Sequence, residues 1–173
     1  MKKYKVLFCD LDGTLIDTLS GATFPKGIWD MKLKFNVIDA IKKLAPQYIF
    51  IVSNQGGIEK GFVDRRNFEF KMEYIIRSMR EYLNYDVFVE YSYCTSNDKK
   101  NEYRKPNIGM CVKLSEKYIQ KNNPCPNLAN KDCLMIGDAS GLEGQFSDSD
   151  KKTAENLGID YMDVNEFVKV WQH

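Results

Sequence analysis

Histidine is almost absent from this sequence of 173 residues, and the one histidine is the last residue, His173. So little imidazole argues against Ser-His-Asp catalysis, an HExxH zinc site and most histidine general bases. Chemistry in this chain must therefore depend on carboxylates, lysine and hydroxyl groups, with a bound metal ion as a further candidate.

Paired cysteines are also lacking. The chain has five cysteines, an odd number, and none of them forms a CxxC pair. A disulfide framework is not indicated. Four of them have no short spacing that would suit zinc: Cys94, Cys111, Cys125 and Cys133. We expect the cysteines to be small core or loop residues.

Long apolar runs are missing as well. The longest are about five residues, such as "YIFIV", against the roughly 20 that a membrane helix needs. The apolar stretch after the basic "MKKYK" is too short for a signal peptide, so we expect a cytoplasmic protein without membrane contact. The net charge of +1 provides no global field for long duplex nucleic acid. A local cluster such as "KKNEYRK" could grip a strand end, although a solvated loop is its default interpretation.

What the chain does have is an alternation of short apolar runs with amphipathic stretches. This pattern predicts one α/β domain over residues 1–173, a Rossmann-like three-layer sandwich around a parallel sheet. The predicted central strands are Val6–Cys9, Tyr48–Val52, Val87–Tyr91 and Cys133–Ile136. The predicted helices lie around Val37–Leu44, Arg66–Leu83 and Gly109–Gln120, before Gly158, and after Asp163.

Local signals refine some of these helices. Asn36 is predicted to cap the first helix, with Asp39 in its first turn, and Asp163 to cap the last. Aromatic residues at helical spacing, including Phe70 and Tyr74, are expected to be mostly core.

Polar residues follow each predicted central strand. Asp10 and Asp12 follow the first, "SNQ" (residues 53–55) the second, Lys105 lies in the loop after the third, and Asp138 follows the fourth. Open α/β sheets build their sites at the carboxyl ends of the strands. We therefore expect these side chains to meet at one edge of the sheet.

The chemistry of this set is coherent. The carboxylates make an all-oxygen site suited to Mg²⁺, and a metal lets a carboxylate approach an anionic phosphate. A carboxylate can attack phosphorus to form an aspartyl-phosphate. Ser53 and Lys105 provide a hydrogen bond and positive charge for the phosphoryl oxygens, and Gly13 permits a tight turn.

In order, "DLDGT", "SNQ", "RKP" and "GD" resemble the four motifs of haloacid dehalogenase (HAD) superfamily phosphatases. The resemblance implies that Asp10 is the nucleophile, Asp12 the general acid/base, Ser53 a phosphoryl contact and Lys105 its neutralising cation. Mg²⁺ would be held by Asp10, the backbone carbonyl of Asp12 and Asp138. Residues beside these motifs are expected to contact substrate: Leu11, Gly13, Thr14, Asn54, Gln55 and Arg104.

The fourth motif departs from the family pattern, which often places a second acid about four residues after the first. Here an insertion of roughly eight residues is inferred, with Asp150 as the outer-sphere metal acid. Glu143 and Asp148 are weaker candidates, and Asp150 could equally be an acid at a helix N-terminus.

The segments "SNQGGIEKG", "YRKPNIGM" and "GDASG…FSDSDKKTAENLG" are similar to the phosphatase domain of polynucleotide kinase 3′-phosphatase, which removes 3′-phosphates from DNA ends. No GxxxxGK[ST] motif occurs, so we expect no kinase half. No insertion is long enough for a large cap domain, and an open site suits a macromolecular end.

Trp29, Tyr103 and Arg104 are candidates to stack on a terminal base, with Lys26 near its phosphates; Trp29 could equally be a core residue. A separate kinase or ligase is a candidate partner, and a monomer is expected. The alternatives are a small-molecule phosphatase of the histidinol-phosphate or sugar-phosphate type, and a catalytically silent phosphate-binding scaffold.

Overall fold

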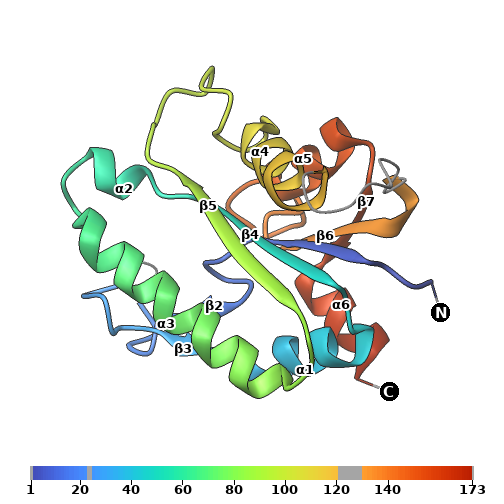
Figure 1. The fold of residues 1–173 in the computed structure, drawn as a ribbon. Helices are drawn as coiled ribbons and strands as arrows, with labels where there is room; N and C mark the ends of the chain where they lie inside the picture. Colours follow the sequence, from blue (N-terminus) through green and yellow to red (C-terminus); the bar gives the residue numbers. More distant parts are fainter. Residues whose placement is uncertain (1, 23–24, 121–129, 173) are drawn as a thin grey trace.

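The protein was examined as a computed structural model, which describes residues 2–22, 25–120 and 130–172. Its centre is a parallel five-stranded sheet in the order β5-β4-β1-β6-β7 (Figure 1). The strands are β1 (Val6–Cys9), β4 (Tyr48–Asn54), β5 (Phe88–Cys94), β6 (Cys133–Gly137) and β7 (Asp160–Asp163). β1 is buried throughout because β4 and β6 pair with its two sides.

Helices cover both faces of this sheet, as the alternating pattern predicts (Figure 1). One face carries α1 (Phe35–Leu44), α3 (Arg65–Leu83) and α6 (Val164–Trp171). The other carries α4 (Gly109–Ser115) and α5 (Ser149–Leu157). The α/β three-layer prediction is therefore confirmed.

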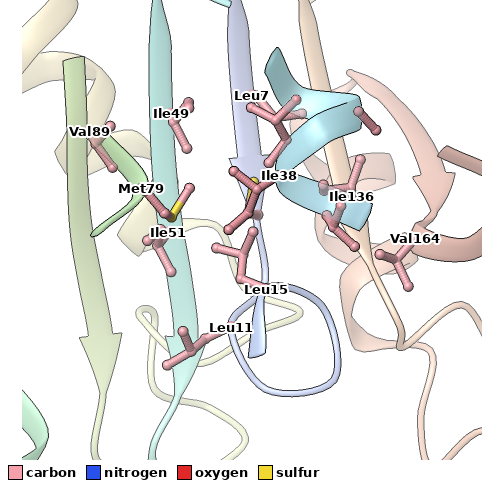
Figure 2. Packing of buried hydrophobic residues seen from close by; sticks show 14 of the residues in the cluster. Leu7, Leu11, Leu15, Ile38, Ile49, Ile51, Met79, Val89, Ile136 and Val164 are labelled. Atoms are coloured by element: carbon pink, nitrogen blue, oxygen red, sulfur yellow. The ribbon is translucent and has the colours of Figure 1, made fainter. Parts of the chain in front are cut away.

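The hydrophobic core is divided by the sheet into two clusters. In β1, Leu7 and Cys9 point to one side, and Val6 and Phe8 to the other, following the period of two of a strand. The first cluster joins side chains of the central strands to Ile38 and Met79 of the covering helices (Figure 2). This packing fixes β1, and with it the position of the residue that follows.

The segments outside the main sheet are short. β2 (Ile16–Asp17) and β3 (Lys32–Leu33) form a small antiparallel pair, and α2 (Gly56–Glu59) follows β4. A π-helical turn, Glu116–Gln120, continues α4, and a 3₁₀ turn, Asn130–Asp132, precedes β6. None of these described segments amounts to a large cap over the sheet edge, as the sequence predicts.

Several local predictions need correction. β7, β2 and β3 were not predicted. Asn36 lies inside α1, whose N-cap is Lys34 without a side-chain hydrogen bond. Phe70 and Tyr74 are exposed, because α3 buries the stripe that contains Phe68, Met72, Ile75 and Met79.

Other expectations are confirmed. Asp163 caps α6, and Gly158 ends α5 in a left-handed conformation. Four cysteines are buried and free, namely Cys9, Cys94, Cys111 and Cys133, while Cys125 lies outside the described residues. Within the described ranges, no helix is long and apolar enough to cross a membrane.

Candidate active site

The carboxyl ends of the central strands bring the predicted residues to one edge of the sheet. Asp10 follows the last residue of β1, and its backbone N–H still pairs with Ile136 of β6. Asp138 follows the last residue of β6, and Ser53 and Asn54 are the last two residues of β4. Parallel pairing alone places these groups together.

Asp10, Asp138 and Asp150 form a compact acid cluster, in which one oxygen of each carboxylate lies within 4.8 Å of the others. Asp150 is 1% exposed and Asp10 is 8% exposed, whereas Asp138 is half-buried. Asp150 reaches the cluster from the first turn of α5, where the N–H of Ala139 donates to its carboxylate at 3.1 Å.

Lys105 supplies the positive charge within this cluster. Its Nζ lies 2.5 Å from Asp10 Oδ1 and 2.7 Å from Asp150 Oδ1, and its side chain is buried. Burial by itself would lower the pKa of Lys105, but Asp10 and Asp150 outweigh burial and hold that pKa above its ordinary value. The ammonium group therefore remains charged.

Lys105 pairs with two of the three carboxylates, Asp10 and Asp150, so full ionisation would leave the acid cluster with more negative charge than Lys105 neutralises. Burial raises the pKa of Asp10 to about 8; Lys105 opposes the rise and Asp150 adds to it. Burial also raises the pKa of Asp138 to about 6, with Asp150 contributing. A divalent cation would remove this excess charge and reverse both shifts.

The residues present fit a hard divalent cation such as Mg²⁺. The donor set of the cluster consists of carboxylate oxygens, the ligands that Mg²⁺ prefers, rather than the nitrogen and sulfur typical of zinc sites. Gly13, with φ of 81°, lies against the cluster, and a Cβ there would overlap the Asp138 carboxylate. Glycine is required at this position for both reasons.

Ser53, Gln55 and Asp12 form a second group at the rim. Gln55 Nε2 donates to Ser53 Oγ and to Asp12 Oδ2, each at 2.8 Å. Ser53 is buried and Asp12 is exposed. The bridging amide holds the Asp12 carboxylate beside the serine hydroxyl while leaving Asp12 open to solvent and to a substrate.

Asn54 braces the loop that carries Lys105. Its Oδ1 accepts from the Lys105 N–H at 2.9 Å, and its Nδ2 donates to the Lys105 carbonyl at 3.1 Å. Arg104 donates from Nη1 to the carbonyl of Ser96 at 2.8 Å. Both side chains thus make bonds that shape the loop.

Two residues predicted to contact substrate lie beneath the rim. Leu11 is fully buried in the core, so only its backbone is available to the site (Figure 2). Thr14 is also buried, and its Oγ1 lies 3.5 Å from Asp10 Oδ2. For these two residues, contact with substrate stays a prediction.

The alternative motif-four acids lie apart from the described acid cluster. Asp148 forms an exposed ion pair with Lys152 at 2.7 Å. Glu143 is exposed in the loop before α5. Of the three candidates, Asp150 is the one that the structure places beside Asp10 and Asp138.

The structure also shows groups that sequence reasoning did not identify as part of the site. Lys34 Nζ donates to the Gly13 carbonyl at 2.7 Å and lies 3.5 Å from Asp17. Ser140 Oγ donates to Asp163 at 2.6 Å and contacts the hydroxyl of Tyr161. No local sequence motif marks Lys34, Ser140 or Tyr161, and the sequence predicts Asp163 only as a helix cap.

The candidate stacking residues lie at the surface. Trp29 is 58% exposed and meets Tyr74 edge to face, with ring centroids 5.6 Å apart. The alternative core interpretation of Trp29 is therefore wrong. Tyr103 is exposed with Lys113 Nζ over its ring, and Lys26 is exposed.

Similarities to known proteins agree with this geometry. A bifunctional polynucleotide phosphatase/kinase of Schizosaccharomyces pombe is 30% identical over 96% of this chain. The histidine biosynthesis bifunctional protein HisB of Actinobacillus pleuropneumoniae is 33% identical over 88% of the chain. The chain spans 38% of the length of each of these two relatives.

Among solved structures, the D,D-heptose 1.7-bisphosphate phosphatase from B. bronchiseptica, complexed with magnesium and phosphate, shares the fold. Its TM-score is 0.66 at 20% sequence identity, covering 91% of this chain and 78% of that one.

The parallel sheet, the acidic motifs at its edge and these similarities identify a phosphatase of the haloacid dehalogenase superfamily. The model of the family "Polynucleotide kinase 3 phosphatase" matches residues 5–168. The chain belongs to that family.

Proposed function

We propose that this protein is a Mg²⁺-dependent phosphomonoesterase that removes 3′-phosphates from nucleic-acid ends through an aspartyl-phosphate on Asp10. The observation that carries the proposal is the Asp10 carboxylate, held by Lys105 within the acid cluster at the carboxyl edge of the sheet. The family match supports the substrate, and the magnesium and phosphate bound to the heptose bisphosphatase support the cofactor.

The first half-reaction transfers the phosphoryl group. A carboxylate oxygen of Asp10 attacks phosphorus, and the bond from phosphorus to the 3′-oxygen breaks. Asp12, held at the rim by Gln55, gives its proton to the departing 3′-oxygen. Ser53 donates a hydrogen bond to the transferred group and Lys105 offsets its charge.

The second half-reaction hydrolyses the intermediate. A water attacks phosphorus, its proton returns to Asp12, and the bond between phosphorus and Asp10 breaks to release phosphate. Asp10, Asp138 and the backbone carbonyl of Asp12 would hold Mg²⁺, whose positive charge would let the anionic nucleophile and phosphate approach each other. Asp150 orients Lys105 through their ion pair and lies beside the proposed metal ligands Asp10 and Asp138.

The rival is a small-molecule phosphatase, which the similarity to HisB favours. A catalytically silent phosphate-binding scaffold is the weaker alternative, because it leaves the presence of the proposed nucleophile, acid and metal ligands unexplained.

The test measures phosphate release from a 3′-phosphorylated oligonucleotide, with 5′-phosphorylated DNA and sugar phosphates compared at equal concentration. We expect the 3′-end to be preferred, EDTA to stop the reaction and Mg²⁺ to restore it without zinc. Asp10→Asn should abolish turnover and keep the fold, because an amide oxygen cannot form an acyl-phosphate. Preference for a sugar phosphate would overturn the substrate, and activity in Asp10→Asn, with deamidation excluded, would overturn the mechanism.

A further inference from the structure

The loop of residues 139–148 runs from Asp138 to the first turn of α5, which carries Asp150, and so joins two members of the acid cluster. Both of its ends are therefore fixed at the site. The fixed ends limit how far a residue of this loop can lie from the acid cluster. Phe146 is four residues from Asp150, a Cα separation of about 14 Å at full extension.

Hydrogen bonds hold the base of this loop in place. Gln145 Oε1 accepts from the N–H groups of Ser140 and Leu142, at 2.7 and 3.2 Å, and its Nε2 donates to Asp163 at 2.8 Å. Gly141 N–H donates to the carbonyl of Ser147 at 3.1 Å, which closes the loop upon itself. Asp163 is in turn fixed at the start of α6.

On this pinned loop, the two apolar side chains Leu142 and Phe146 point outward. Leu142 is 57% exposed and Phe146 is fully exposed, although Gln145, the residue before Phe146, is bonded to the buried Asp163. A single exposed apolar residue on a surface is unremarkable. Here the two apolar side chains lie on one hydrogen-bonded loop whose ends are both at the acid cluster.

We propose that Phe146, supported by Leu142, stacks on a nucleobase near the 3′-end of the substrate strand. This inference rests on the proposed function. A strand advances about 3.4 Å per nucleotide in a duplex, so the first few bases from the reacting phosphate lie within the reach of the loop. A phenyl ring presents the flat apolar face that base stacking uses, without dependence on sequence. The exposed Lys151, next to Asp150, suits a neighbouring phosphate of the same strand.

The experiment compares wild type, Phe146→Ala and a matched control, Phe70→Ala, on two substrates. Phe70 is an exposed phenylalanine on the outer side of α3. With a 3′-phosphorylated oligonucleotide, Phe146→Ala should lower kcat/KM about tenfold, within the range of base–aromatic stacking. With an aryl phosphate, which has no base to stack, Phe146→Ala should match wild type. Phe70→Ala should match wild type on both.

A second readout follows binding directly. An oligonucleotide with 2-aminopurine at each of the last three positions in turn should change fluorescence on binding the inactive Asp10→Asn protein. One of these positions should lose that change when Phe146→Ala is added, and Phe146→Trp should restore it.

The two proposals fail differently. Equal oligonucleotide kinetics in wild type and Phe146→Ala, with the 3′-end still preferred, would overturn the role of Phe146 and leave the proposed function standing. Equal losses on the aryl phosphate would also overturn it, because the change would then act on the chemistry. A wild type that does not distinguish an oligonucleotide from a sugar phosphate would overturn the substrate and the stacking role together.

Discussion

At the scale of single residues, the acid cluster carries more negative charge than Lys105 can neutralise. Lys105 lies between Asp10 and Asp150 and cannot balance Asp138 as well. Asp150 is buried and orients the ammonium group, whereas Asp148, two residues away, makes only a solvent-exposed pair with Lys152. Exposed pairs contribute about 0–1 kcal/mol to stability. The two acids therefore form a matched pair for mutation.

Asp150→Asn should raise the Mg²⁺ concentration for half-maximal activity by about 10–100-fold, the usual effect of losing a group that supports metal ligands. Asp148→Asn should leave it unchanged. Titration calorimetry of Mg²⁺ binding provides a measurement independent of turnover. Equal Mg²⁺ requirements in the two variants would show that Asp150 does not support metal binding.

Asp12 is expected to act by proton transfer rather than by attack on phosphorus. General acid–base catalysis contributes about 10²–10⁴-fold, so Asp12→Asn should lose roughly that much on a substrate with an alkoxide leaving group. An activated aryl phosphate needs less protonation and should show a smaller loss. Comparable losses on both substrates would contradict the acid role.

At the scale of elements, the Asp163 carboxylate joins the loop of residues 139–148 to the start of α6. Asp163 accepts hydrogen bonds from Ser140, Gln145 and the N–H of Asn165, so the end of β7, the start of α6 and the loop share one anchor. Burial alone would raise the pKa of Asp163, but the bonds from Ser140, Asn165 and Gln145 outweigh it and hold that pKa below its ordinary value. Folding thus favours the charged form.

A depressed pKa gives the sign of the pH effect. The stability due to the Asp163 charge is present above the ordinary aspartate pKa of 3.8 and is lost as pH falls through the lower folded value. Asp163→Asn should reduce the free energy of unfolding by about 1–3 kcal/mol near pH 7. Denaturant titrations of both proteins should show this difference shrinking below about pH 4. A constant difference across that range would show that the charge is not involved.

At the scale of the whole molecule, the sheet edge and the charge distribution limit how much of a nucleic acid the protein can hold. None of the described segments around the edge forms a large cap, and the net charge is only +1. Under the proposed function, the exposed Trp29 and Lys26, which follow the first motif in the sequence, are candidate contacts for a few nucleotides. The expected mode of binding is recognition of an end rather than of a long duplex.

Substrate length and salt test this mode of binding. An oligonucleotide should exceed a 3′-mononucleotide in kcat/KM, and the gain should level off within a few nucleotides. For a single strand, the logarithm of the binding constant changes with the logarithm of the salt concentration by about −0.7 per phosphate contact. A site that contacts about four phosphates or fewer should therefore give a slope no steeper than about −3. Kinetics indifferent to both length and salt would favour a small-molecule substrate.

Much of the fold and the site follows from the sequence alone. Short apolar runs predict β1, β4 and β6, because the sheet buries these central strands on both faces. The edge strand β5 is marked only by the shorter apolar run of residues 87–89. Parallel strands end at one edge, so Asp10, Ser53 and Asp138 meet there once the strands are known. Lys105 follows from the motif resemblance, although its loop is long.

The tertiary structure decided the features that no local pattern encodes. β7 escaped prediction because "DYMD" is an edge strand without an apolar run. In α3 the sequence interpretation placed Phe70 and Tyr74 in the core, whereas the helix buries Phe68, Met72 and Ile75. The sequence left three acids open for the fourth motif. Asp150 was selected because Gln145, Ser140 and Asp163 fold the insertion back on itself and return the start of α5 to the cluster. Such long-range hydrogen bonds depend on where distant segments lie in space, which spacing along the chain does not specify.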